Sequence, residues 1–106
     1  MSRGEIDIAR NFKTIEWLKT ELIGGVANLF RAMMQNSEDA IVDTLVNIII
    51  TGYLLCRRLG ISPERLEAKM ESKVKANMDA EHEMEKWYGD FSALYYHILD
   101  RGKKKT

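Results

Sequence analysis

The chain has 106 residues, of which 45% are hydrophobic and 30% charged, a composition typical of one small soluble domain and not of a disordered segment. Sixteen basic and sixteen acidic residues cancel, so no net charge attracts the protein to nucleic acid or to an anionic membrane. A single cysteine, Cys56, excludes an internal disulfide and a multi-cysteine zinc module. We therefore expect a cytoplasmic protein that binds neither nucleic acid nor membrane.

Residues 1–10 are expected to form a short helical turn or to be irregular. They show no apolar run of the kind found in a signal peptide. Asn11 is a plausible cap for a first long helix, since apolar residues then recur at helical spacing as far as Met33. Gly24 and Gly25 interrupt it, each costing about 1 kcal/mol relative to alanine. The apolar period stays in phase on both sides, which favours close packing against the glycines over a break.

The most apolar stretch, from Ser37 to Gly60, is predicted to be a helix buried on most sides, around which the rest of the chain is organised. A turn is expected over 35–37, with Ser37 as the N-cap of this helix and Gly60 as its stop signal. The apolar run at 41–56 is shorter than a membrane span and contains Asp43 and Asn47. This favours a protein core over a membrane helix.

The remaining chain predicts two further helices. A third helix with a lysine-rich face is expected to end at a turn over 77–79, and a last amphipathic helix to cover 80–100, followed by a frayed basic tail at 102–106. The predicted fold is all-α, a four-helix bundle in one domain over 1–106 with its core at 11–77. Because the central helix is apolar nearly all round, we expect a homodimer or homotetramer to complete the bundle.

One polar stripe on the central helix points to chemistry. Asp39, Asp43 and Asn47 follow one another at four-residue steps and share a face. A carboxylate buried among apolar groups needs a partner or a metal, and antiparallel packing of the first long helix would bring Glu21 towards Asp43. Two such carboxylates suit Mg²⁺, which completes its shell with water and substrate phosphates. The alternative is that Glu21 lies in solvent and an arginine neutralises Asp43.

Two segments also resemble a known family, the MazG-like all-α nucleotide pyrophosphohydrolases. TELIGGVANL, residues 20–29, is similar to the family's first motif helix, E-E-x-x-E, with Glu21 at the second glutamate. DTLVNIIITGYLLCRRLGIS, residues 43–62, is similar to the second motif helix, E-x-x-D, with Asp43 at the aspartate. The overall match is closest to the small branch simply called MazG-like proteins. The chain departs from the family's glutamates at Thr20, Gly24 and Ala40.

The resemblance implies a Mg²⁺-dependent enzyme that converts a nucleoside triphosphate to the monophosphate and pyrophosphate. Glu21 and Asp43 would be catalytic and would bind the metal, with Asp39 as a substitute ligand. The implied substrate-binding residues are Trp17, Asn47, Lys73, Lys75 and Asn77. The lysines could equally form a solvated face, and Trp17 could belong to the core.

Two other functions remain open. The missing glutamates favour a member that has lost catalysis and persists as an oligomeric nucleotide-binding or protein-interaction module. A helix-binding adaptor would instead require exposed aromatic residues on the last helix, namely Trp87, Phe91 or Tyr95.

Overall fold

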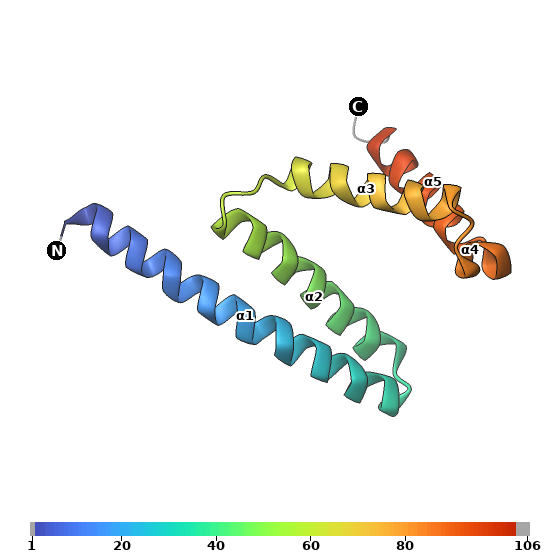
Figure 1. Ribbon diagram of the computed structural model, residues 1–106. Coiled ribbons are helices and arrows are strands. Elements are labelled where there is room, and N and C mark those ends of the chain that lie inside the picture. The colour runs from blue at the N-terminus through green and yellow to red at the C-terminus, as the bar shows by residue number, and fades with distance from the viewer. Residues whose placement is uncertain (1, 104–106) are drawn as a thin grey trace. The chain divides into compact units, whose positions relative to one another are not determined.

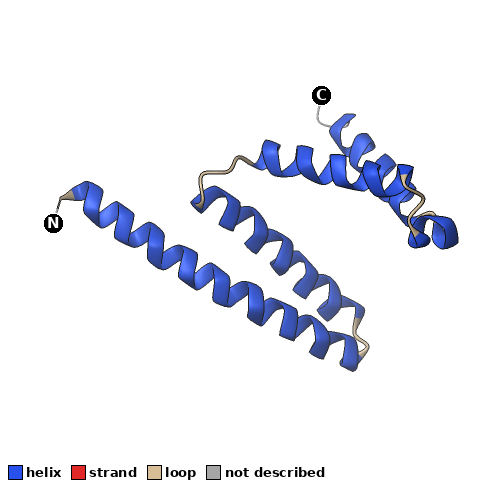
Figure 2. Cartoon of the chain, viewed as in Figure 1, coloured by secondary structure: helices blue, strands red, loops and turns tan. Residues whose placement is uncertain are grey.

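The computed structural model describes residues 2–103 as five α-helices, with no strand in that range (Figures 1 and 2). The helices are α1 (Arg3–Gln35), α2 (Glu38–Arg58), α3 (Pro63–Asp79), α4 (Glu83–Tyr88) and α5 (Asp90–Lys103). The prediction of an all-α chain is confirmed, with five helices in place of four. The chain divides into two compact units, Met1–Pro63 and Glu64–Thr106, which are described in turn. The single-domain organisation stays a prediction.

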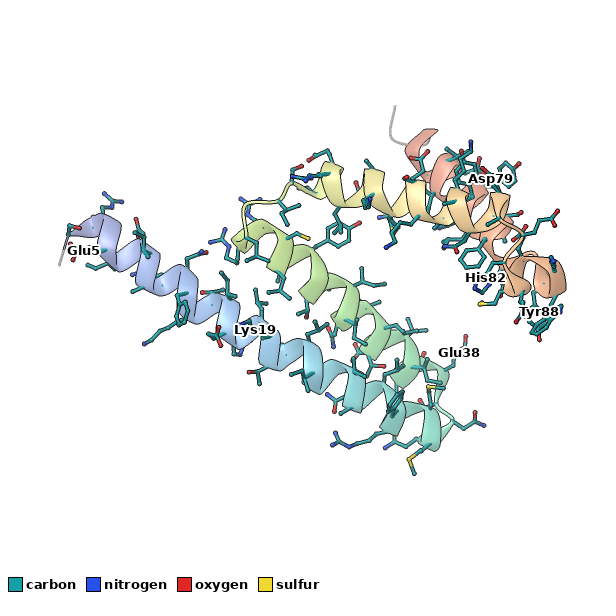
Figure 3. All side chains as sticks on the ribbon, in the orientation of Figure 1. Glu5, Lys19, Glu38, Asp79, His82 and Tyr88 are labelled. Carbon is teal, nitrogen blue, oxygen red and sulfur yellow. The ribbon has the colours of Figure 1, made fainter. Side chains whose placement is uncertain are left out.

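The first unit is an antiparallel hairpin of α1 and α2 (Figure 1). Asn36 ends α1 in the left-handed conformation, at φ 54°, and Ser37 caps α2 by accepting a hydrogen bond from the backbone N–H of Ala40 at 3.3 Å. Glu38, labelled in Figure 3, lies in the first turn of α2, where a negative charge complements the helix dipole. The predicted cap and turn are confirmed, because both depend on local chemistry alone.

The start of α1 differs from the prediction. The helix begins at Arg3, and the side chain of Ser2 caps it by accepting from the backbone N–H of Glu5 at 3.2 Å. Asn11 lies inside the helix, where its side-chain amide donates to the carbonyl oxygen of Arg58 at 3.1 Å. Asn11, a residue type common at helix caps, thus forms a contact between α1 and the end of α2. Sequence spacing alone does not reveal such a contact.

The glycine pair on α1 permits a close approach of the two helices. A Cβ atom on Gly25 would lie 3.1 Å from Cγ1 of Ile48 on α2, whereas a Cβ on Gly24 would meet nothing within 4 Å. The prediction of an unbroken helix packed closely at the glycines is confirmed at Gly25. This contact also fixes the register of the hairpin, since it places Gly25 level with Ile48.

The central helix is not enclosed by its own chain, contrary to the expectation that it is buried on most sides. Thr51 is the one buried residue of α2. Its large apolar side chains that are between 42% and 58% exposed are Val42, Leu45, Val46, Ile49, Ile50 and Leu54. A helix that is apolar on several faces finds in a two-helix unit only one neighbour to pack against, so most of this surface stays open.

On length and composition alone, α2 could also cross a membrane, and it is the one helix among residues 2–103 of which this holds. It has 21 residues, with a mean hydropathy of 1.6 over its most apolar window. The prediction of too short a span considered only the apolar run, whereas the helix also includes its charged ends. The core helix of a soluble protein has the same properties, so they do not identify a membrane protein.

The second unit contains α3, α4 and α5, and its boundaries correct two predictions. Helix α3 continues through the expected turn at 77–79, and the chain turns at Glu81, where φ is 53°. The expected last helix over 80–100 is broken at Gly89, whose φ of 67° ends α4. The apolar period continues across this break, so periodicity did not show it. Helix α5 includes Gly102, which was expected to fray; residues 104–106 lie outside the described part of the chain.

A hydrogen-bonded clasp joins α4 to α5. The carboxylate of Glu85 accepts from the hydroxyl of Ser92 and from its backbone N–H, the latter at 2.9 Å. These bonds lower the pKa of Glu85, and the hydroxyl of Ser92 contributes most. Beside the clasp, the ring of His82, labelled in Figure 3, meets the ring of Phe91 edge-on at 5.2 Å.

The clasp should weaken in acid. The pKa of Glu85 is lower in the folded state than its ordinary value of 4.5, so its stabilisation is present above pH 4.5 and is lost as the pH falls through the folded-state value. We expect Ser92→Ala to raise the pKa of Glu85, measured by NMR titration of the carboxyl carbon. Glu83→Gln, which removes a charge two residues away, should alter the pKa of Glu85 far less. An unchanged pKa in Ser92→Ala would show that the clasp does not form in solution.

Candidate functional site

A hollow of about 450 Å³ lies between α1 and α2, within the first unit. The α1 residues that line it are Trp17, Leu18, Thr20, Glu21, Gly24, Gly25 and Asn28. The α2 residues that line it are Thr44, Asn47, Ile50, Thr51 and Leu54. The absence of a side chain at Gly24, where nothing lies within 4 Å, helps to keep the space open. Its volume is within the range of small-molecule sites.

Three of the predicted site residues meet at this hollow, namely Trp17, Glu21 and Asn47. Trp17 is 58% exposed, so it is not the core residue that its apolar stripe could equally have indicated. Thr44 and Thr51 also line the hollow. Neither was predicted as a site residue, although Thr51 continues the polar row of Asp39, Asp43 and Asn47 by another turn. Their position on the face of Asn47, at three- and four-residue steps, was the signal that could have identified them.

The two aspartates do not line the hollow. Because the helices are antiparallel, Glu21, four residues before Gly25, lies level with residue 52, four residues after Ile48. Asp43 lies nine residues from that level, which is about 13 Å along the axis at 1.5 Å per residue. Magnesium holds its ligands at about 2.1 Å, so one chain does not bring Glu21 and Asp43 together on one ion.

Asp39 lies a further turn away from Glu21 than Asp43 does, towards the start of α2. Both aspartates are exposed. Nowhere in residues 2–103 are three or more His, Cys, Asp or Glu side chains grouped so that they could hold a metal ion. The premise of a buried carboxylate that needs a metal therefore does not apply to Asp43.

The threonines that line the hollow already donate their hydroxyl protons in hydrogen bonds within their own helices. Thr20, Thr44 and Thr51 each donate to the backbone carbonyl oxygen four residues earlier, at 3.2, 3.0 and 2.7 Å respectively. A hydroxyl that donates in this way has only acceptor lone pairs left. Glu21 is the one charged residue among those that line the hollow. The site is therefore negative and has apolar walls. Its threonine oxygens accept hydrogen bonds, and the side-chain amides of Asn28 and Asn47 also offer donors.

The predicted phosphate-binding residues lie on α3, in the second unit. Lys73 and Lys75 are exposed, and Nζ of Lys75 is 4.0 Å from the carboxylate of Asp79, labelled in Figure 3. Asn77 donates to the carbonyl oxygen of Lys73 at 3.0 Å. An exposed pair at this distance contributes little to stability. This geometry is that of a solvated helix face, and it carries no sign of a built phosphate site.

His82 precedes α4 and Trp87 lies in its last turn. His82 caps α4, because its Nδ1 accepts from the backbone N–H of Met84 at 3.2 Å. It thus has a structural role that needs no metal. Trp87 is 67% exposed, so the condition for the adaptor function is met at this one aromatic residue.

Comparison with known proteins gives one finding. A family model described as MazG-like matches residues 8–91, which include the whole hollow. No curated protein and no solved structure matches the chain.

Proposed function

The chain belongs to the MazG-like family. We propose that it is a member of this family that lacks the hydrolytic metal centre and serves as an oligomeric binding module. In this proposal the hollow between α1 and α2 takes a small ligand. The observation that carries it is the lining of the hollow, where Glu21 is the one charged side chain.

The position of the hollow changes how the family's motif is placed on α2. Among the α2 residues that line the hollow together with Thr20, Glu21 and Gly24, Thr44 and Asn47 have the spacing of E-x-x-D, one turn beyond Ala40 and Asp43. On this placement Glu21 is the only carboxylate of the motif that the chain keeps.

This donor set does not fit free Mg²⁺. Hard cations depend on anionic oxygen ligands, and the hydroxyl and amide oxygens of Thr44 and Asn47 supply no charge. The lining also contains no lysine or arginine. A triphosphate would therefore meet the negative charge of Glu21 without a neutralising partner.

Oligomerisation is supported by the open surface of α2. Its half-exposed apolar side chains form a contiguous face of a kind that soluble proteins usually cover with a partner. We propose that a second copy covers it in a cytoplasmic homodimer or homotetramer. Gel filtration with light scattering should give at least twice the monomer mass, and Ile49→Glu should reduce it to that of the monomer.

The second candidate is the Mg²⁺-dependent pyrophosphohydrolase. It is favoured by the meeting of Trp17, Glu21 and Asn47 at one hollow. Mg²⁺ would then have to be bound to the triphosphate already, since this cation can be held by a single carboxylate together with substrate phosphates.

Titration calorimetry separates the two candidates. We expect no binding of Mg²⁺ to the protein with a Kd below about 1 mM, no binding of the preformed Mg²⁺ complex of a non-hydrolysable nucleoside triphosphate, and no release of pyrophosphate from any of the common triphosphates. Pyrophosphate release that Glu21→Gln abolishes and Asp43→Asn leaves intact would establish the hydrolase and overturn the first proposal. Release that Asp43→Asn abolishes would overturn the assignment of the hollow as well.

A further inference from the structure

We propose that the hollow between α1 and α2 binds a small organic monocation, an ammonium or guanidinium group attached to an apolar body. The inference rests on the proposed function, because a hollow that held a divalent metal would repel a second cation. It names the chemical class of the ligand, which the proposed function leaves open.

The first argument is the unmatched charge of Glu21. This residue takes part in none of the hydrogen bonds or ion pairs found among residues 2–103, whereas Glu16, about one turn earlier on α1, is paired with Lys19 at 2.8 Å. The guanidinium of Arg31, ten residues further along α1, donates to Oδ1 of Asn28 at 2.7 Å. Glu21 is exposed and is the one charged residue that lines this partly apolar hollow. Its charge attracts a cation that enters the hollow and repels an anion.

The second argument is the polarity of the threonine hydroxyls that line the hollow. The hydroxyls of Thr20, Thr44 and Thr51 can only accept, as their protons are bound to backbone carbonyl oxygens. A primary ammonium group has three donors and a guanidinium five, and neither has an acceptor. Such a group can satisfy several of these oxygens at once, which a carboxylate or phosphate ligand could not do.

The third argument is the size and the apolar part of the hollow. A volume of about 450 Å³ is far larger than a single ion needs and suits a molecule of several non-hydrogen atoms. Leu18, Ile50 and Leu54 provide apolar walls for the body of such a molecule. Trp17, half-exposed at the same hollow, offers an aromatic face that attracts a cation.

The test is calorimetry with three probes of equal length: hexylammonium, 1-hexanol and hexanoate. We expect hexylammonium to bind saturably, hexanol at least tenfold more weakly and hexanoate not at all. Glu21→Gln should weaken hexylammonium at least tenfold, whereas Glu16→Gln, the same change outside the hollow, should leave it unaltered. Both glutamates are exposed, so circular dichroism should show both variants folded.

A second readout locates the ligand. In a Trp87→Phe background the remaining tryptophan is Trp17, and its fluorescence should change with hexylammonium in proportion to the calorimetric binding. Three results would each overturn the inference: hexylammonium binding that does not saturate, hexanol binding as tight as that of hexylammonium, or hexylammonium binding that Glu21→Gln does not weaken. Lack of amine binding in a protein that also fails to bind Mg²⁺ would leave the proposed function standing, whereas pyrophosphate release would remove both.

Discussion

The variant Gly24→Glu/Asn47→Asp is expected to bind Mg²⁺ about a hundredfold more tightly than the wild type, a gain of about 2.7 kcal/mol. Both positions line the hollow with Glu21, and Asn47 lies two residues, about 3 Å along the axis, from the level of Gly24, so the two substitutions would bring three carboxylates to one space. Anionic oxygens are the ligands that this cation prefers. Calorimetry with Mg²⁺ alone is the direct measurement.

Thermal unfolding gives an independent check on this variant. Without metal, three neighbouring carboxylates repel one another and should lower the melting temperature, and millimolar Mg²⁺ should restore it by binding the folded state. The matched control is Gln35→Glu/Asn36→Asp, which adds the same charge at the exposed turn of the hairpin. Equal Mg²⁺ affinity in the two variants would mean that the hollow is not the counterpart of the family's metal centre.

The substitution Gly25→Leu is expected to destabilise the hairpin by about 3 kcal/mol. Even the first atom of the new side chain would lie 3.1 Å from Cγ1 of Ile48, and the atoms beyond it would need space that α2 occupies. The helices would have to separate, which would loosen the packing of the buried residues Leu18 and Ala32. Chemical denaturation followed by circular dichroism measures the loss.

Gly24→Leu is the matched control, since it makes the same change one residue away. Nothing lies within 4 Å of a Cβ at Gly24, and leucine favours a helix over glycine by about 1 kcal/mol, so stability should be unchanged or slightly raised. The new side chain would enter the hollow and should abolish hexylammonium binding. Equal stability of the two leucine variants would contradict the close approach at Gly25.

The sequence alone determined the features that depend on neighbouring residues. It identified an all-α chain, the cap at Ser37 and the turn before α2, because a cap bonds to a backbone amide three residues away. It also determined that something packs against the glycine pair, since an unbroken apolar period across two glycines indicates a close neighbour. The family followed from motifs of the same local kind, and the family match confirms it.

The tertiary structure decided the features that depend on how two helices are placed against each other. The register set by Gly25 and Ile48 brings Asn47 and Thr51 of α2 to the same hollow as Glu21 and leaves Asp43 about 13 Å from Glu21 along the axis. Spacing within one helix shows which residues share a face, but it does not show which level of that face meets a given residue on the next helix. The break at Gly89 escaped prediction for a related reason, because helical periodicity can continue through a change of chain direction.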